Sequence, residues 1–268
     1  MAEASYDVIV VGAGIIGAST AHFLKKKGVD RVLLIDRGDP ASGGTGKSAA
    51  IVRSYYSIPV MARLAKEAVQ LFHNLEAEIG VDGGFHATGF TQLVPPDWVD
   101  TAKELVAMHQ SLSIDTDFVE ESEWAKRFPW LESDGIGAIV VENSSGYADP
   151  VQTTEGFVSA FTKAGGEFRP RTPVRALART GDRITGIILE DETIASGAVV
   201  NATGPWSTFL AASAELDLPM RAVREQDTVW EVVPGRELPT TPVSNPIEAT
   251  YMRPVSYTHL TLPTILLV

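Results

Sequence analysis

The sequence predicts an α/β fold that contains a Rossmann-like strand–helix–strand unit, and its first 36 residues carry this prediction. Residues 6–11 form an apolar run rich in Val and Ile, which suits a buried parallel strand. Residues 15–27 follow with a helical pattern, and Gly28 stands in the place of a left-handed cap. A second apolar run, 31–35, ends at Asp36. A strand, a helix and a strand within about 30 residues are what a dinucleotide-binding unit requires.

Three glycines connect the first strand to the helix in the spacing Gly12-x-Gly14-x-x-Gly17. The first glycine permits a tight turn, the second lets backbone approach a pyrophosphate, and the third lets helix and strand pack closely. The helix N-terminus offers free N–H groups and a partial positive charge to phosphates. Asp36, 19 residues after Gly17, can accept hydrogen bonds from a ribose hydroxyl; the alternative is an aspartate in a surface turn.

The remaining chain continues with helical and strand patterns. We expect helices at 60–79, 101–110 and 153–163, a strand-to-helix passage over 117–128, and strands at 90–94, 136–141, 174–178, 184–189 and 198–200. In the first of these helices one face carries the apolar residues Val60, Leu64, Ala68, Leu71, Leu75 and Ile79, and Gly80 closes the helix.

Composition excludes several classes of function. The chain of 268 residues carries a formal charge of −12, which argues against a nucleic-acid partner because phosphate neutralisation needs clustered Lys and Arg. The absence of cysteine removes disulfides, Cys-based metal sites and thiol nucleophiles. The five histidines show no metal-ligand spacing, so we expect no metal. Neither a secretory signal nor a membrane span is apparent, and we expect a cytoplasmic protein.

The octet ASGGTGKS at 41–48 nearly spells a triphosphate-binding loop, but its context disfavours that interpretation. A triphosphate loop connects a buried strand directly to a helix. Here the preceding strand ends at Ile35, and ten residues separate it from Gly46. Ala41 stands where the pattern has its first glycine. We expect instead that the loop Ser42–Ser48 folds back over a dinucleotide.

A second nucleotide signal is VVNATGPWS at 199–207, where a buried strand ends in small residues that let backbone approach a ligand. Because this strand lies far downstream, the chain leaves the nucleotide domain and returns to it. That order is more typical of flavoproteins with an inserted substrate domain than of nicotinamide dehydrogenases. The alternative is an ordinary strand end with a turn.

At these residues the sequence resembles the FAD-dependent oxidoreductases of the D-amino-acid oxidase and sarcosine oxidase family. The resemblance runs from VIVVGAGIIGAS through GGTGKSAAIVRSYY, HATGFTQLV, ENSSGYADPVQTTEGF, TPVRAL and VVNATGPWS to YMRP. Within the family it is similar to sarcosine oxidase beta-type subunits and dimethylglycine dehydrogenase-like proteins. The resemblance implies a Rossmann-like FAD-binding domain with an interleaved α+β substrate domain that carries a mainly antiparallel sheet.

The resemblance also implies roles for individual residues. FAD would be held by Gly12, Gly14, Ile15, Gly17, Asp36, Arg37, Thr45, Lys47, Ser48, Val174, Ala202 and Gly204. Arg53 matches a position where monomeric sarcosine oxidases carry an arginine that binds the substrate carboxylate; the alternative is a helix-surface arginine in a salt bridge. The implied chemistry is oxidation of the C–N bond of a small amine or amino acid, with hydride transfer to the flavin.

The resemblance also suggests domain boundaries. We expect an FAD-binding domain at 1–90 and 150–215, a substrate domain at 91–149 and 216–254, and a non-native tail at 255–268, where the sequence resembles adapter read-through. The alternative for the tail is an authentic apolar terminal strand. The resemblance implies a C-terminally truncated chain. Its partners would be a small amine or amino-acid substrate and a partner subunit or electron acceptor. A non-catalytic nucleotide-binding polypeptide is the second hypothesis, and a nicotinamide-dependent dehydrogenase is a third.

Overall fold

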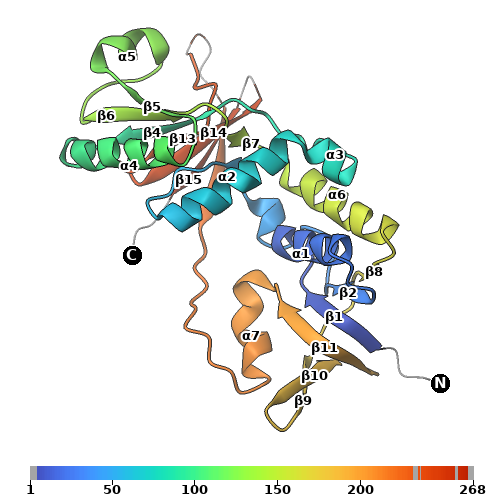
Figure 1. Ribbon diagram of the computed structural model, residues 1–268. Helices are drawn as coiled ribbons and strands as arrows, with labels where there is room; N and C mark the ends of the chain where they lie inside the picture. The colour runs from blue at the N-terminus through green and yellow to red at the C-terminus, as the bar shows by residue number, and fades with distance from the viewer. Residues whose placement is uncertain (1–4, 232–234, 236, 257–258, 265–268) are drawn as a thin grey trace. The chain divides into compact units, whose positions relative to one another are not determined.

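The computed structural model describes residues 5–231, 235, 237–256 and 259–264, and the chain divides into two compact units (Figure 1). Unit 1 comprises 1–48, 75–83 and 149–223, and unit 2 comprises 49–74, 84–148 and 224–268. The chain therefore passes between the units five times. The fold is mixed α/β, as the sequence predicts. No helix among the described residues is long and apolar enough to span a bilayer.

Unit 1 is built on a six-stranded sheet in the order β8-β2-β1-β11-β10-β9. Its strands are β1 (Ser5–Val11), β2 (Val32–Ile35), β8 (Glu167–Arg169), β9 (Ala176–Thr180), β10 (Arg183–Ile188) and β11 (Thr193–Asn201). The strands β8, β2, β1 and β11 run parallel, and β10 and β9 form an antiparallel edge. The predicted strand–helix–strand unit is present as β1, α1 (Ile15–Lys26) and β2. Gly28 follows α1 with φ +88°, the left-handed conformation expected of its cap.

The helices of unit 1 pack along this sheet and around one another. They are α1, α3 (Leu75–Ile79), α6 (Pro150–Lys163) and α7 (Ser207–Ala212), with one-turn 3₁₀ helices η1 (Thr45–Lys47) and η3 (Gly204–Trp206). Helix α6 begins at Asp149, whose side chain accepts the N–H groups of Val151 and Gln152 as an N-cap. Strand residues form the core, with Ile9, Leu33, Ile35 and Ile187 fully buried.

Unit 2 is built on a seven-stranded sheet in the order β12-β15-β14-β13-β4-β6-β5, in which all pairs are antiparallel except β13 with β4. Its strands are β4 (Phe90–Val94), β5 (Thr116–Val119), β6 (Ala138–Glu142), β12 (Gln226–Glu231), β13 (Val243–Asn245), β14 (Thr250–Ser256) and β15 (His259–Thr264). A separate ribbon pairs β3 (Ile51–Val52) with β7 (Gly146–Tyr147). The helices are α2 (Pro59–His73), α4 (Val99–Ser111) and α5 (Glu121–Arg127), with η2 (Pro96–Trp98) before α4.

The expected single helix over 60–79 is wrong, because the chain forms two helices that break at Asn74. Asn74 leaves the helical conformation at φ −116° and ψ 19°, while its side chain donates to the carbonyl of Gln70. Val60 and Leu64 of the expected apolar face are 54 % and 61 % exposed. The break lies at the boundary between the units, so α2 belongs to unit 2 and α3 to unit 1.

The unit boundaries differ from the expected domain boundaries in several segments. Asp149 and residues 216–223, assigned from the sequence to the substrate domain, belong to unit 1. Residues 49–74 and 84–90, assigned from the sequence to the FAD-binding domain, pack within unit 2. Part of the expected tail forms β15, which pairs with β12 and β14; residues 257–258 and 265–268 lie outside the described residues. The assignment of a substrate domain and the origin of the tail stay predictions.

Candidate nucleotide-binding site

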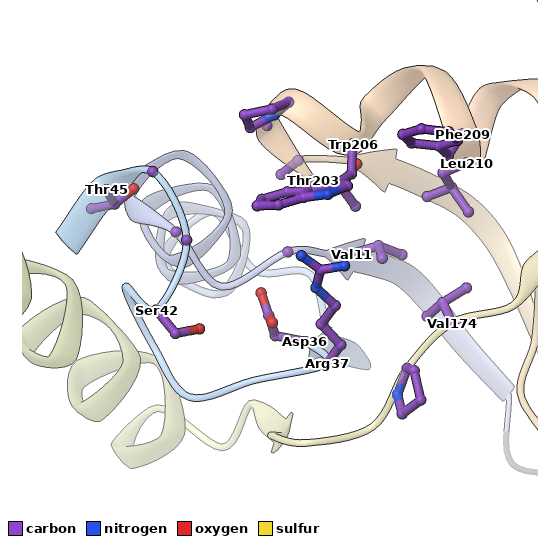
Figure 2. A pocket seen from close by; sticks show the side chains of 18 of the residues that line it. Val11, Asp36, Arg37, Ser42, Thr45, Val174, Thr203, Trp206, Phe209 and Leu210 are labelled. Atoms are coloured by element: carbon purple, nitrogen blue, oxygen red, sulfur yellow. The ribbon is translucent and has the colours of Figure 1, made fainter. Parts of the chain in front are cut away.

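A cavity of about 520 Å³ lies in unit 1 beyond the carboxyl ends of three neighbouring parallel strands (Figure 2). Strands β2, β1 and β11 end at Ile35, Val11 and Asn201, and the segments that follow them line the cavity. The segment 172–175 completes the wall. Ligands of open α/β sheets bind in such a crevice at the carboxyl ends of the strands.

The turn after β1 is closed by glycines that no larger residue could replace without moving the backbone. Gly12 has φ +110°, and a Cβ there would lie 2.3 Å from the carbonyl oxygen of Ala202. A Cβ on Gly17 would lie 1.7 Å from the carbonyl oxygen of Gly12. The first glycine thus lets the β1 turn approach the β11 turn, and the third lets α1 pack on the β1 turn. Gly17 itself does not line the cavity.

Gly14 caps helix α1 and leaves its first turn open to the cavity. The hydroxyl oxygen of Thr45 accepts the N–H of Ile15 at 3.2 Å, so Ile15 has a partner within the protein. The next two N–H groups, of Ile16 and Gly17, belong to the first helical turn and have no partner inside the helix. A Cβ on Gly14 would lie 2.9 Å from the Thr45 hydroxyl, inside the space that this contact needs.

Asp36 stands at the end of β2 with its carboxylate beside the glycine turn. One carboxylate oxygen accepts the N–H of Ala13 at 2.6 Å, and the other accepts the N–H of Gly38 at 2.8 Å. Each oxygen has a further lone pair, so the half-buried carboxylate can still accept a ligand hydroxyl. The neighbouring Arg37 reaches toward the ring of Trp206, with its guanidinium carbon 4.1 Å from the ring centroid (Figure 2). This is cation–π distance.

The loop that resembles a triphosphate-binding loop folds back beside the β1 turn. Ala41 donates its N–H to the carbonyl of Ala13 at 3.0 Å, and Gly46 donates to the carbonyl of Ala41 at 2.9 Å. The single 3₁₀ turn η1 ends at Ser48, whose backbone is extended with ψ 147°, and strand β3 follows. The loop therefore lacks the helix that a triphosphate site requires. Lys47 and Thr45 line the cavity, whereas Ser48 does not.

The turn after β11 is held by the side chain of Asn201. Its amide donates to the carbonyl of Ser207 at 2.9 Å and its oxygen accepts the hydroxyl of Thr203 at 2.7 Å. Gly204 takes φ +57° at the start of η3, and Ala202 lies beside Gly12. Across the cavity, Val174 contributes to the wall, and neither its N–H nor its C=O takes part in the backbone hydrogen bonds among described residues.

The sequence reasoning missed part of the lining. Trp206 and Phe209 face the cavity from the β11 turn and α7, Thr172 and Pro173 precede Val174, and Ile16 projects from the start of α1. Phe209 and Ile16 are 73 % and 68 % exposed, which is unusual for large apolar side chains. The sequence does indicate Trp206 and Phe209, because Trp206 belongs to the motif VVNATGPWS and Phe209 lies two residues after it.

Arg53 is placed by the structure in unit 2, outside the cavity of unit 1. It follows strand β3 and is half-buried, with its guanidinium carbon 4.6 Å from the ring centroid of Tyr56 and 5.4 Å from that of Phe90. The guanidinium donates to the carbonyl of Tyr55. None of the ion pairs among described residues includes Arg53. The alternative interpretation, a helix-surface arginine in a salt bridge, is therefore wrong.

The donor set of the cavity fits a dinucleotide. Backbone N–H groups at a helix start and a lysine suit a pyrophosphate. A carboxylate beside them suits ribose hydroxyls, and the flat Arg37–Trp206 stack with the free backbone of Val174 suits an aromatic base. The close packing at Gly12 and Gly17 keeps the β1 turn, the β11 turn and the start of α1 together, so that backbone rather than side chains forms this wall of the cavity.

Comparison with known proteins gives the same result independently. The sequence profile of the family described as "FAD dependent oxidoreductase" (DAO) matches residues 7–263. The chain is 25 % identical to the mitochondrial dimethylglycine dehydrogenase of Rattus norvegicus over 87 % of this chain and 28 % of that protein. It is 28 % identical to the sarcosine oxidase subunit beta of Rhodobacter capsulatus over 85 % of this chain and 56 % of that protein.

A solved structure supports the fold. The L-proline dehydrogenase of P. horikoshii superposes with a TM-score of 0.85 and 22 % identity, over 97 % of this chain and 70 % of that one. The chain spans only about a quarter of the dimethylglycine dehydrogenase it matches, at 28 %.

Proposed function

Because the chain belongs to the DAO family of FAD-dependent oxidoreductases, we propose that the cavity of unit 1 holds FAD and that the whole protein oxidises the C–N bond of a small amine or amino acid. The observation that carries the proposal is the cavity at the carboxyl ends of β2, β1 and β11, lined by a glycine turn and by Asp36. FAD is the cofactor of the family. When bound, it supplies the acceptor for the two electrons that leave the substrate.

Each wall of the cavity has a proposed task. The N–H of Ile16 at the start of α1 and the ammonium of Lys47 hold the pyrophosphate, because the first is a hydrogen-bond donor at a helix N-terminus and the second is positively charged. Gly17 contributes by letting α1 pack on the β1 turn. Asp36 accepts a ribose hydroxyl with the lone pairs that Ala13 and Gly38 leave open. Thr45 acts indirectly, since it fixes the start of α1 through the N–H of Ile15.

The base of the nucleotide lies between two walls in this proposal. The N–H and C=O of Val174 offer hydrogen bonds to a ring edge, and the Arg37–Trp206 stack offers a flat surface to the ring face. Ala202 and Gly204 keep the backbone of the β11 turn close to the ligand because they have little or no side chain. Ser48 lies outside the cavity lining, so its direct contact with FAD has no support from the geometry.

Arg53 is proposed to bind the carboxylate of an amino-acid substrate. A guanidinium that is half-buried, held between aromatic rings and not ion-paired with any described carboxylate is suited to that task. The two relatives are named for dimethylglycine and sarcosine. These names favour a small N-methylated amino acid as the substrate class. The relative named as a subunit favours a partner subunit.

The visible absorption spectrum of the purified chain after gel filtration tests the cofactor. We expect a flavin spectrum that co-elutes with the folded protein, and release of free FAD on denaturation, which shows non-covalent binding. If the folded chain is incubated with excess FAD and still elutes from gel filtration without flavin, the result contradicts the proposed site.

A second candidate is a nucleotide-binding polypeptide without catalysis of its own. The small share of the relatives' length that the chain spans favours it, because the remaining length can supply parts of a catalytic site. Turnover of any amine substrate by the isolated chain would rule this candidate out. Cytoplasmic location stays a prediction from the sequence.

A further inference from the structure

A buried carboxylate, that of Glu142, lies at the end of strand β6 in the sheet of unit 2. Glu142 pairs directly with Phe90 of β4 on one side and with Thr116 of β5 on the other. Residues that pair directly across strands lie on the same face of a sheet, so the three side chains project together. Helix α4 packs on this face through Val106, and its His109 is fully buried. The carboxylate thus lies in a buried layer that is mostly apolar but also contains Thr116 and His109.

The carboxylate of Glu142 is held by two donors on one oxygen. Glu142 is 1 % exposed, and its Oε2 accepts the N–H of Ser54 at 2.8 Å and the hydroxyl of Ser145 at 2.8 Å. Its Oε1 has no hydrogen-bond partner among the described residues. Burying a carboxylate costs free energy, which the two hydrogen bonds to Oε2 offset only in part because Oε1 stays unpaired among these residues. One of the two donors, the N–H of Ser54, is a backbone group, so its hydrogen bond restrains the main chain there.

The charges that face Glu142 come from two elements packed on its face. Burial raises the pKa of the Glu142 carboxyl, while the donors Ser145 and Ser54 and the nearby His109 and Arg53 act in the opposite direction. Burial also raises the pKa of Tyr55 to about 12, helped by the charge of Glu142. The imidazole Nε2 of His109 donates to the carbonyl of Tyr56 at 3.0 Å. The segment 53–56 and the carboxylate therefore share one environment.

The hydrogen bond from Ser54 connects Glu142 to the substrate-binding candidate. The N–H of Ser54 belongs to the peptide bond that joins Arg53 to Ser54, and its acceptor lies 88 residues downstream. Immediately after this bond the chain turns so that the Arg53 guanidinium donates to the carbonyl of Tyr55. A change in the ψ angle of Arg53 would swing the following residues away from its side chain, and the guanidinium would lose the Tyr55 carbonyl and the Tyr56 ring that hold it.

We propose that Glu142 is a positioning residue: by accepting the N–H of Ser54, it holds the Arg53 guanidinium in place for a carboxylate ligand. The inference rests on the proposed carboxylate-binding role of Arg53. What matters is the reach of the side chain to Ser54, not its charge, because the amide oxygen of glutamine at the same length can accept the same N–H. An aspartate keeps the charge but is one methylene too short.

Two conservative variants separate length from charge. The FAD-loaded full chain is titrated with N,N-dimethylglycine and with its neutral amide, and binding is measured by calorimetry, while the Ser54 amide is followed by its proton NMR shift. We expect Glu142→Asp to bind the carboxylate about tenfold more weakly and to lose the downfield Ser54 shift. We expect Glu142→Gln to stay within about threefold of the parent chain and to keep the shift. Ser145→Ala, which removes the other donor, should match the parent.

The outcomes distinguish a failure of the positioning role of Glu142 from a failure of the carboxylate-binding role of Arg53. Equal affinity for acid and amide in both the parent chain and Arg53→Ala would overturn the role of Arg53. With that role intact, an unchanged carboxylate affinity in Glu142→Asp would overturn the positioning role. A Glu142→Gln variant weaker than Glu142→Asp would also overturn it, since charge would then matter more than reach.

Discussion

Gly14 and Gly44 offer a matched pair for testing the nucleotide cavity at the scale of single residues. Both line the cavity, yet a Cβ on Gly14 meets the Thr45 hydroxyl at 2.9 Å, whereas a Cβ on Gly44 meets nothing within 4 Å. We expect Gly14→Val to weaken FAD binding by more than about tenfold, because it displaces Thr45 and covers the start of α1. Gly44→Ala should stay within about twofold, as its φ of −61° suits any residue.

Quenching of flavin fluorescence on titration with each variant measures the difference. Flavin binding by Gly14→Val at the parent affinity would contradict the assignment of the cavity. A loss in both variants, with retained folding, would mean that the loop rather than the glycine turn limits binding.

How far the sequence predicts the site depends on how local each residue is. Gly12, Gly14 and Asp36 lie within one strand–helix–strand unit, where spacing alone determines their places. Thr172 and Trp206 reach the same cavity only because β8 and β11, which they follow, flank β2 and β1 in the sheet, and no local pattern encodes that order. The family resemblance supplied Val174, Ala202 and Gly204 for the same reason.

The contact between α1 and α3 is an element-scale feature that depends on pH. Glu78 of α3 accepts hydrogen bonds from Lys26 at 2.6 Å and from His22 at 2.9 Å, both on α1. The bond from Lys26, followed by that from His22, lowers the pKa of Glu78 below its usual 4.5. A depressed carboxyl pKa means that its stabilisation is present above pH 4.5 and is lost as pH falls through the folded-state pKa.

We therefore expect Glu78→Gln to lower the free energy of unfolding at pH 7 by about 0.5–1 kcal/mol, after allowance for solvent screening. The difference from the parent chain should shrink toward zero as the pH falls below the usual range of carboxyl groups. Urea unfolding at several pH values measures it. Glu76→Gln on the same short helix is the control, since Glu76 is exposed; a deficit for Glu78→Gln that is independent of pH would contradict the charge argument.

Several elements were predicted to within a few residues where an apolar pattern marks them, whereas others were missed, among them the strands β12 and β14. Strand β4 has the bounds expected for 90–94, and α4 and α6 extend their expected ranges by only a few residues. Strands β3, β7 and β13 contain two or three residues each, too few for any period to appear. The break at Asn74 was missed because an apolar repeat ran through it, although its two halves are buried in different units.

The whole molecule should respond to FAD unevenly, because the cavity lies within one unit. It is lined by segments near 11–47, 172–175 and 202–210, all of unit 1. FAD at a hundred times its dissociation constant adds about 2.7 kcal/mol to the stability of whatever unfolds with the site. We expect slower amide hydrogen exchange in β1, β2 and β11 when FAD is added, and a smaller change in β4 and β6. Equal slowing in all five strands would indicate that both units unfold as one.

The pairing of β1 with β11 also sets an order in time. Ser5 lies opposite Ala195 in the sheet. Strand β1 therefore cannot pair with β11 until about 190 further residues have left the ribosome. Until then β1 has only β2 beside it and presents an open edge of Val and Ile, the kind of edge that invites pairing with other chains. A nascent chain is thus exposed to misassembly at this edge until the residues of β11, Thr193–Asn201, have emerged. Slow translation upstream of residue 193 would lengthen that exposure, and a chaperone that covers the β1 edge would shorten it.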